Sequence, residues 1–119
     1  LRSQGLSILF ITHDLSLGYY ISDRAVILYR GRIVEMGPTD RVYHDPLHPY
    51  TQMLMEAVPR LDRKWEEKTR TERESDLALS AMCGCVYVGR CPKAMDPCTQ
   101  QEPGLKEAAT GHYVACWAV

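Results

Sequence analysis

The chain has 119 residues, a formal net charge of −1 and 45% apolar residues. This length allows one modest domain, or part of a domain with an extension. The balanced charge lacks the basic excess that nucleic-acid binding demands, so we expect no nucleic-acid partner. No apolar run approaches the ~18 residues that a membrane-spanning helix needs, and the first residues do not resemble a signal peptide. The composition therefore predicts a soluble, cytosolic protein.

The chain opens without a methionine, and a predicted buried strand, Leu6–Thr12, follows almost at once. We therefore expect a piece of a larger protein. His13 and Asp14 follow where this strand must end. In open α/β sheets, ligands bind outside the carboxyl ends of the strands. This position makes His13 a candidate site residue, although position alone favours a structural histidine.

The next elements are predicted from the apolar pattern. A helix is expected from about Asp14 to Ser22, and a second buried strand over 25–29. Residues 30–32 are expected to turn the chain into a third strand, Ile33–Met36. The alternation in that strand predicts one solvated face.

Two helices are expected after the third strand. Gly37-Pro38 ends the strand, and Thr39 is expected to cap a short helix through about His44. A longer helix is predicted from about Pro49 to Val58, because proline suits the first helical position. Between residues 60 and 76, twelve of seventeen residues are charged, which predicts a solvated linker or an exposed helix.

All five cysteines lie in the last third of the chain. An odd number without a secretory signal favours metal or cluster ligation over a disulfide scaffold. About forty residues cannot bury a sufficient core alone, so a bound metal or cluster would stabilise this segment. Zinc sites made of four cysteines usually use pairs two to four residues apart. The wider spacing of Cys85, Cys91, Cys98 and Cys116 suits an iron–sulfur cluster with four cysteine ligands.

Other interpretations of the cysteines stay open at this point. They are a zinc site, buried free thiols, and two disulfides formed on oxidation. Cys83 is expected to be the cysteine left over, and it is the alternative to Cys85 as a ligand. His112, four residues before Cys116, is a candidate non-cysteine ligand, but a solvated surface histidine is the expected role.

Several motifs resemble a known family. Four motifs resemble the end of an ABC-transporter ATPase domain: Phe10-Ile11-Thr12-His13-Asp14-Leu15, Ser22-Asp23-Arg24, Tyr29-Arg30-Gly31-Arg32-Ile33-Val34-Glu35 and Gly37-Pro38-Thr39. Two further motifs resemble, more specifically, the ATP-binding subunits of oligopeptide, dipeptide and nickel ABC importers: Asp45-Pro46-Leu47-His48-Pro49-Tyr50-Thr51 and Glu56-Ala57-Val58-Pro59. The last third of the chain also resembles this family, at Gly84-Cys85, Arg90-Cys91-Pro92, Ala94-Met95, Cys98, Gly111-His112 and Val114-Ala115-Cys116.

The resemblance implies an α/β fold with four parts. They are the C-terminal piece of a P-loop ABC ATPase domain at 1–46, a joint helix at 47–59, a charged linker at 60–80 and a small irregular cysteine-rich extension at 81–119. The charged stretch departs from the family, which usually has a proline-rich linker there, and Cys83 is an extra cysteine.

The resemblance also implies site residues. His13 resembles the switch-loop histidine, which in the family hydrogen-bonds the γ-phosphate of ATP. A neutral imidazole can donate one hydrogen bond to phosphate while a neighbour holds its other nitrogen. A four-iron (4Fe–4S) cluster, with zinc in its place after cluster loss, is implied at Cys85, Cys91, Cys98 and Cys116. A packing joint between ATPase domain and extension is implied at His48, Pro49 and Tyr50.

The phosphate-binding motif G-x-x-x-x-G-K-[ST] does not occur in the sequence. The magnesium-binding aspartate, its adjacent glutamate and the ABC signature are missing as well. Since phosphoryl transfer depends on all these parts, the chain alone is not expected to hydrolyse ATP. The whole protein would use ATP and magnesium to power peptide or nickel uptake, at the cytoplasmic face of the membrane, with a second ATPase subunit and permease subunits.

Two rival hypotheses belong to other classes. One is a stand-alone iron–sulfur or zinc-binding interaction module without ATPase activity. The other is a structural dimer, because apolar strands with unpaired edges favour self-association.

Overall fold

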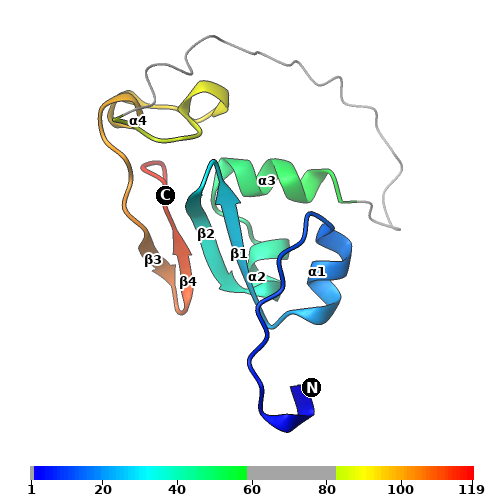
Figure 1. Cartoon of the computed structure of the whole chain (residues 1–119). Coiled ribbons are helices and arrows are strands. Elements are labelled where there is room, and N and C mark those ends of the chain that lie inside the picture. The colour runs from blue at the N-terminus through cyan, green and yellow to red at the C-terminus, as the bar shows by residue number, and fades with distance from the viewer. Residues whose placement is uncertain (1, 59–82) are drawn as a thin grey trace.

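The computed structural model describes residues 2–58 and 83–119 (Figure 1). The first part contains a 3-10 turn at Arg2–Gln4, then α1 (Leu15–Ile21), β1 (Arg24–Tyr29), β2 (Arg32–Pro38), α2 (Thr39–His44) and α3 (Pro49–Glu56). The second part contains the 3-10 turn η3 (Val88–Arg90), α4 (Asp96–Gln100), β3 (Lys106–Ala109) and β4 (His112–Val114). Within these two ranges, no helix is long and apolar enough to cross a membrane.

Four strands form one antiparallel sheet in the order β1-β2-β4-β3. β1 and β2 make a hairpin in which Ile27 lies opposite Glu35. At the hairpin turn, Arg30 and Gly31 have φ angles of 48° and 78°, the left-handed conformation that the tightest hairpin turns need. The predicted turn and the two strands around it are confirmed, but the strand at 25–29, which was expected to be buried, exposes Val26 and Leu28.

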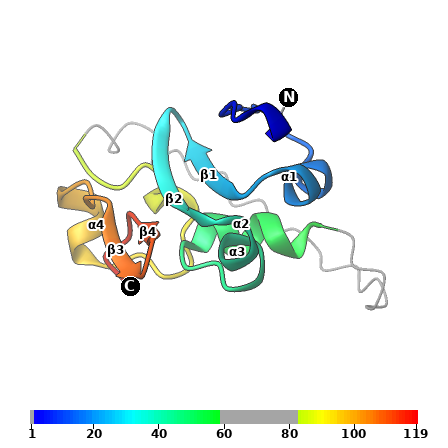
Figure 2. The same ribbon diagram turned by 90° about the horizontal axis from the view of Figure 1, so that it is seen from below.

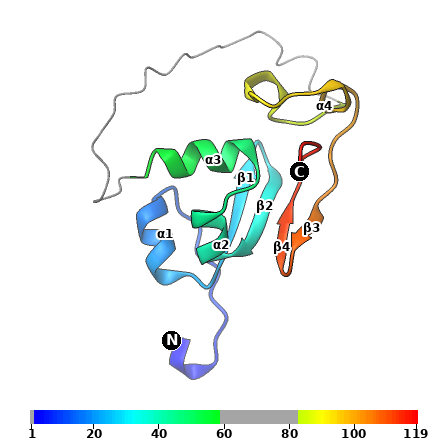
Figure 3. The same ribbon diagram turned by 180° about the vertical axis from the view of Figure 1, so that it is seen from behind.

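The end of the chain joins the same sheet. β4 pairs with β2, with Val114 opposite Glu35, and the backbone N–H of Ala115 donates to the carbonyl oxygen of Val34 at 2.9 Å. Figure 3 shows β4 and β3 beside β2, although about 75 residues separate them in sequence. The irregular extension predicted from the sequence is therefore wrong for β3 and β4. These strands have three or four residues each, too short to carry a readable alternation.

The three helices of the first part begin as their sequences dictate. The Asp14 side chain caps α1 by accepting from the N–H of Leu17 at 3.0 Å. Pro49 is the first residue of α3, and the His48 side chain caps that helix. Thr39 is the first residue of α2 rather than its cap, because the chain already turns at Pro38. The predicted helices exist, with ends shifted by one or two residues.

The main core lies where α2 and α3 cover one face of the sheet, as Figure 2 shows from below. Its fully buried members are aliphatic or thioether side chains: Ile27, Val34, Val42 and Met55. Burial of each such side chain stabilises the fold by about 1.5–3 kcal/mol. This core fixes β2 and the start of α3 relative to each other, which positions the residues described next.

The prediction of a buried strand at Leu6–Thr12 is wrong for the described structure. The segment is irregular and lies outside the sheet, and its apolar side chains are exposed, with Leu9 at 88% and Ile11 at 85%. An apolar strand is buried only where a neighbouring strand pairs with it, and the described sheet leaves this segment without one. Self-association through it stays a prediction, and the charged stretch at 60–76 lies outside the described residues.

Candidate functional site

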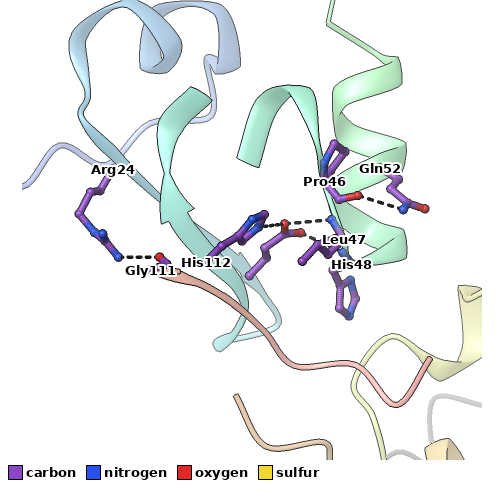
Figure 4. Close-up of polar contacts among 8 residues, drawn as sticks. Arg24, Pro46, Leu47, His48, Gln52, Gly111 and His112 are labelled. Carbon is purple, nitrogen blue, oxygen red and sulfur yellow. Dashed lines mark hydrogen bonds and ion pairs between the residues drawn. The ribbon is translucent and has the colours of Figure 1, made fainter. Parts of the chain in front are cut away.

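A buried carboxylate ties the two parts of the sheet together. Glu35, on β2, is 0% exposed. Its Oε1 atom accepts from the backbone N–H of Leu47 at 3.0 Å, and its Oε2 atom accepts from the N–H of His48 at 2.9 Å. The Nε2 atom of His112, on β4, lies 2.6 Å from Oε1. Figure 4 shows the His112 ring and the Leu47–His48 backbone converging from opposite sides.

The structure therefore corrects two expectations. Glu35 was expected on a strand with a solvated face, and His112 was expected at the surface. Both are buried, with His112 at 2% exposure. A buried carboxylate needs hydrogen bonds or an opposite charge, and here two amides and an imidazole satisfy it. The partners are 77 residues apart in sequence, so no local pattern signals the pair.

His48 caps α3 through its ring. Its Nδ1 atom accepts from the N–H of Tyr50 at 3.0 Å, which places the ring proton on Nε2. Burial lowers the pKa of His48 to about 4, and the nearby Glu35 carboxylate only partly opposes that shift. The imidazole is therefore neutral near pH 7, as the cap requires.

Tyr87 packs the cysteine-rich part against this joint. Its ring centroid lies 5.6 Å from that of His48, 5.4 Å from Tyr50 and 5.2 Å from Tyr29, distances typical of aromatic pairs. Its hydroxyl donates to the sulfur of Met53 at 3.7 Å. Burial, and next the electrostatic effect of Cys91, raise the pKa of Tyr87. Two residues of the implied joint, His48 and Tyr50, thus contact a residue of the cysteine-rich part, and Pro49 is buried beside them.

The four matched cysteines come from four separate places in the second part. Cys85 precedes η3, Cys91 follows it, Cys98 is in α4 and Cys116 follows β4. Cys91 is half-buried and the other three are buried, whereas Cys83 is exposed. All five are free thiols. The N–H of Cys85 donates to the carbonyl oxygen of Cys98 at 2.7 Å, which brings two of these turns into direct contact.

The four thiols influence one another electrostatically. Burial raises the pKa of Cys85, backbone hydrogen bonds partly offset that rise, and Cys98 and Cys116 raise it further. Burial likewise raises the pKa of Cys91, with added effects from the other three thiols. In residues 2–58 and 83–119, no three His, Cys, Asp or Glu side chains lie close enough together to hold a single metal ion. The donor set is all thiol, the chemistry that iron–sulfur clusters use.

His13 lies apart from these residues in the chain, at the exposed bend just before α1. The Asp14 N–H beside it donates to the side-chain oxygen of Thr12 at 2.9 Å. This exposed position leaves the ring accessible to a ligand.

A pocket of about 210 Å³ opens between α1, α2 and α3, and none of the predicted site residues lines it. It is lined by Ser16, Tyr19, Tyr20, Tyr43, His44, Met55 and Val58. The pocket is smaller than most small-molecule sites, which measure roughly 300–1,000 Å³.

A family model described as "Oligopeptide/dipeptide transporter, C-terminal region" matches residues 34–98, more than half of the chain. The chain belongs to this family. The matched residues include Glu35, the His48–Tyr50 joint and three of the four cysteines. The fourth cysteine, Cys116, and His112 follow the matched range.

Individual relatives match nearly the whole chain. The oligopeptide transport ATP-binding protein OppF of Salmonella typhimurium is 44% identical over 121 residues, covering 99% of this chain and 36% of that relative. The dipeptide transport ATP-binding protein DppF of Escherichia coli is 43% identical over 118 residues, covering 97% of this chain and 34% of the relative. A putative peptide import ATP-binding protein of Brucella ovis is 43% identical over 117 residues, 94% of this chain and 36% of the relative. The chain thus spans about a third of the length of these curated relatives.

The sequence alone indicated the joint residues and the cysteines as candidate site residues of this oligopeptide/dipeptide transporter family. It did not indicate the Glu35–His112 pair. The available signal was a charged residue inside an otherwise apolar strand, Ile33–Met36, and a histidine next to a glycine turn. Neither residue alone distinguishes a buried tie from a solvated side chain.

Proposed function

We propose that this chain is part of the ATP-binding subunit of a peptide importer. The observation that carries the proposal is the near-complete alignment with proteins whose names state ATP binding and peptide transport. In the whole protein, this subunit would hydrolyse ATP at the cytoplasmic face of the membrane, bound to permease subunits and to a second ATPase subunit. Peptide, dipeptide or nickel is the proposed substrate class.

His13 is proposed to contact the γ-phosphate of ATP in the whole protein. Its exposed position at the bend before α1 supports this role, because it leaves the ring accessible to a ligand. In the full-length protein, His13→Ala is expected to lower ATP turnover by roughly two to three orders of magnitude, the scale of losing one transition-state donor. Nucleotide affinity is expected to change much less, since other groups bind the remaining phosphates.

Steady-state ATP hydrolysis and nucleotide titration of the His13 variant measure these two effects separately. His44→Ala is a matched control, because His44 is also an exposed histidine but belongs to α2. Near-normal turnover in the His13 variant would assign His13 a structural role instead.

Four cysteines are proposed to bind a 4Fe–4S cluster: Cys85, Cys91, Cys98 and Cys116. Support comes from the mutual electrostatic effects of their thiols, from the backbone hydrogen bond between Cys85 and Cys98, and from the exposure of Cys83, which sets that cysteine apart. These four thiolates would hold the cluster, and the cluster would add stability to a segment with a small core. Replacement by zinc is the proposed outcome of aerobic cluster loss.

Anaerobic iron and sulfide analysis tests this proposal. The wild-type chain is expected to contain about four irons, with broad absorption near ~400 nm. Serine at any of the four positions is expected to abolish the colour, whereas Cys83→Ser is the matched control and is expected to keep it. Wild type without iron after reconstitution, or colour that depends on Cys83 but not on Cys85, would contradict the assignment.

A stand-alone cysteine-centred interaction module is the second candidate function. It is favoured by the buried cluster of Cys85, Tyr87 and Cys98 in the second part. Sequencing the gene upstream of the codon for Leu1 separates the two candidates, since an importer subunit requires the phosphate-binding motif in the same protein.

A further inference from the structure

We propose that Glu35 and His112 are positioning residues that hold Cys116 beside the other three thiols. Glu35 is on β2, in the core of the first part, and His112 begins β4. Cys116 follows only two residues after β4 ends. The Glu35–His112 pair therefore sets the place from which the chain delivers its fourth thiol.

One carboxylate connects three segments. Oε1 receives both the Leu47 N–H and the His112 ring, and Oε2 receives the His48 N–H. The Leu47 and His48 N–H groups belong to the residues that lead into α3, and the ring belongs to β4. Because the Glu35 and His112 side chains of this tie are both buried, loss of either one leaves an unsatisfied polar group in the interior.

The other contacts of β4 are short strand pairings and apolar burial. β4 pairs with β2 at two positions, and its other neighbour, β3, is exposed along its length. Val114 is fully buried, and Ala115 is buried beside it. The Glu35–His112 pair adds a buried polar link to these contacts and so contributes to holding β4 on the sheet.

Gly37 provides independent evidence that His112 must sit close to β2. A Cβ atom at position 37 would lie 3.2 Å from both the Cα and the Cδ2 atoms of His112, and 3.3 Å from the Gly111 carbonyl oxygen. The backbone of β2 therefore leaves room for the β4 turn only because it lacks a side chain there. An alanine at position 37 would therefore displace His112 while leaving its side chain unchanged.

The effect reaches the thiol centre through Cys116. Cys116 is buried, and its thiol acts electrostatically on both Cys85 and Cys91. Release of β4 would carry Cys116 away from the other three thiols. The role of the centre as a cluster site rests on the proposed function, but the positioning of Cys116 does not.

Thiol alkylation measures this positioning directly. The full 119-residue chain, reduced and treated with chelator, is reacted with N-ethylmaleimide, and each cysteine is followed by peptide mass spectrometry. Because Cys83 is exposed, its alkylation rate is the reference for an unprotected thiol. Glu35→Gln and His112→Leu are each expected to speed alkylation of Cys116 by roughly a hundredfold, the scale of leaving a buried hydrogen-bonding group unsatisfied. Cys98, which lies in α4, is expected to change less than about threefold, because its backbone is also held by the hydrogen bond from the Cys85 N–H.

Conservative variants separate positioning from general stability. His112→Gln keeps an N–H donor at similar reach and is expected to restore most of the protection of Cys116. Gly37→Ala is expected to expose Cys116 by displacing His112. Gly104→Ala is the matched control, because a Cβ atom there would meet nothing within 4 Å.

Three results would overturn the proposal. One is a Cys116 that stays protected in both Glu35→Gln and His112→Leu. Another is equal exposure of Cys98 and Cys116, which would make Glu35 a general stability residue. The third is a His112→Gln variant that behaves like His112→Leu. Iron analysis of the untreated wild type is independent of these outcomes, so a chain without iron that shows the expected alkylation pattern contradicts the proposed cluster and supports the positioning.

Discussion

The two parts of the molecule are stabilised by different side chains. In the first part, α2 and α3 bury an aliphatic core against the sheet, centred on Val34 and Val42. In the second part, the buried cluster is Cys85, Tyr87 and Cys98, with no aliphatic residue among its fully buried members in the described range. Apolar burial near 25 cal/mol per Å² therefore stabilises the first part through an aliphatic core that the cysteine cluster of the second part lacks.

This difference means that the second part depends on specific links. The described links are the β2–β4 pairing, the Glu35–His112 pair, the Tyr87 ring contacts and the close approach of the cysteine turns. A segment of this size without a large core needs such links, a bound metal centre, or both. Variants that remove one link should therefore affect the second part more than the first.

The largest effect is expected from Gly84→Ala. A Cβ atom at residue 84 would lie 2.4 Å from the Cys98 carbonyl oxygen and 2.9 Å from the Thr99 carbonyl carbon. Because these are backbone atoms, the turns that carry Cys85 and Cys98 must separate. We expect a loss of about 3 kcal/mol in the unfolding free energy of the second part, at the upper end of overpacking effects.

Urea unfolding followed by Tyr fluorescence and by far-UV circular dichroism measures this loss. Gly104→Ala is the matched control and is expected to stay within about 0.5 kcal/mol of wild type. Equal stability of the two alanine variants would show that the cysteine turns do not need their observed contact.

The sequence predicted the elements of the first part because each has a local signal. The Asp14 cap, the Arg30-Gly31 turn and Pro49 at the start of α3 all act within a few residues of the structure they define. The apolar pattern also placed Ile27 in the core. Local chemistry alone is sufficient for these features.

Burial of particular side chains was harder to predict, because it depends on distant partners. Glu35 is buried since His112 and the start of α3 satisfy it, while the apolar Leu9 is exposed since no strand covers it. Hydropathy alone would place the charged Glu35 at the surface and the apolar Leu9 in the interior. The candidate cysteines were recognisable from spacing and resemblance, but the side chains that position them were not.

A smaller, pH-dependent effect is expected at His48. Its pKa is about 4 in the folded chain against 6.5 as its ordinary value, so the unfolded chain takes up the proton first as the pH falls. Stability is then present above about pH 6.5 and is lost progressively between pH 6.5 and 4. The full shift corresponds to at most about 3 kcal/mol.

His48→Asn isolates this contribution, because an asparagine oxygen can accept from the Tyr50 N–H but does not titrate. Urea unfolding at pH 7 and at pH 4.5 is the measurement. The wild type is expected to lose more stability than the variant over this range. Identical losses in the two proteins would assign the pH dependence to other groups.

Hydrogen exchange of single amides tests most directly whether the two parts take their order from different sources. The informative amides are those of Cys85 and Ala115 in the second part, and of Gln52 in α3, all hydrogen-bonded to backbone carbonyls. The chain is compared anaerobically before and after reconstitution with iron and sulfide. We predict that reconstitution slows exchange of Cys85 and Ala115 about tenfold or more and leaves Gln52 unchanged. Unchanged exchange at all three amides, or equal slowing at Gln52, would contradict the account.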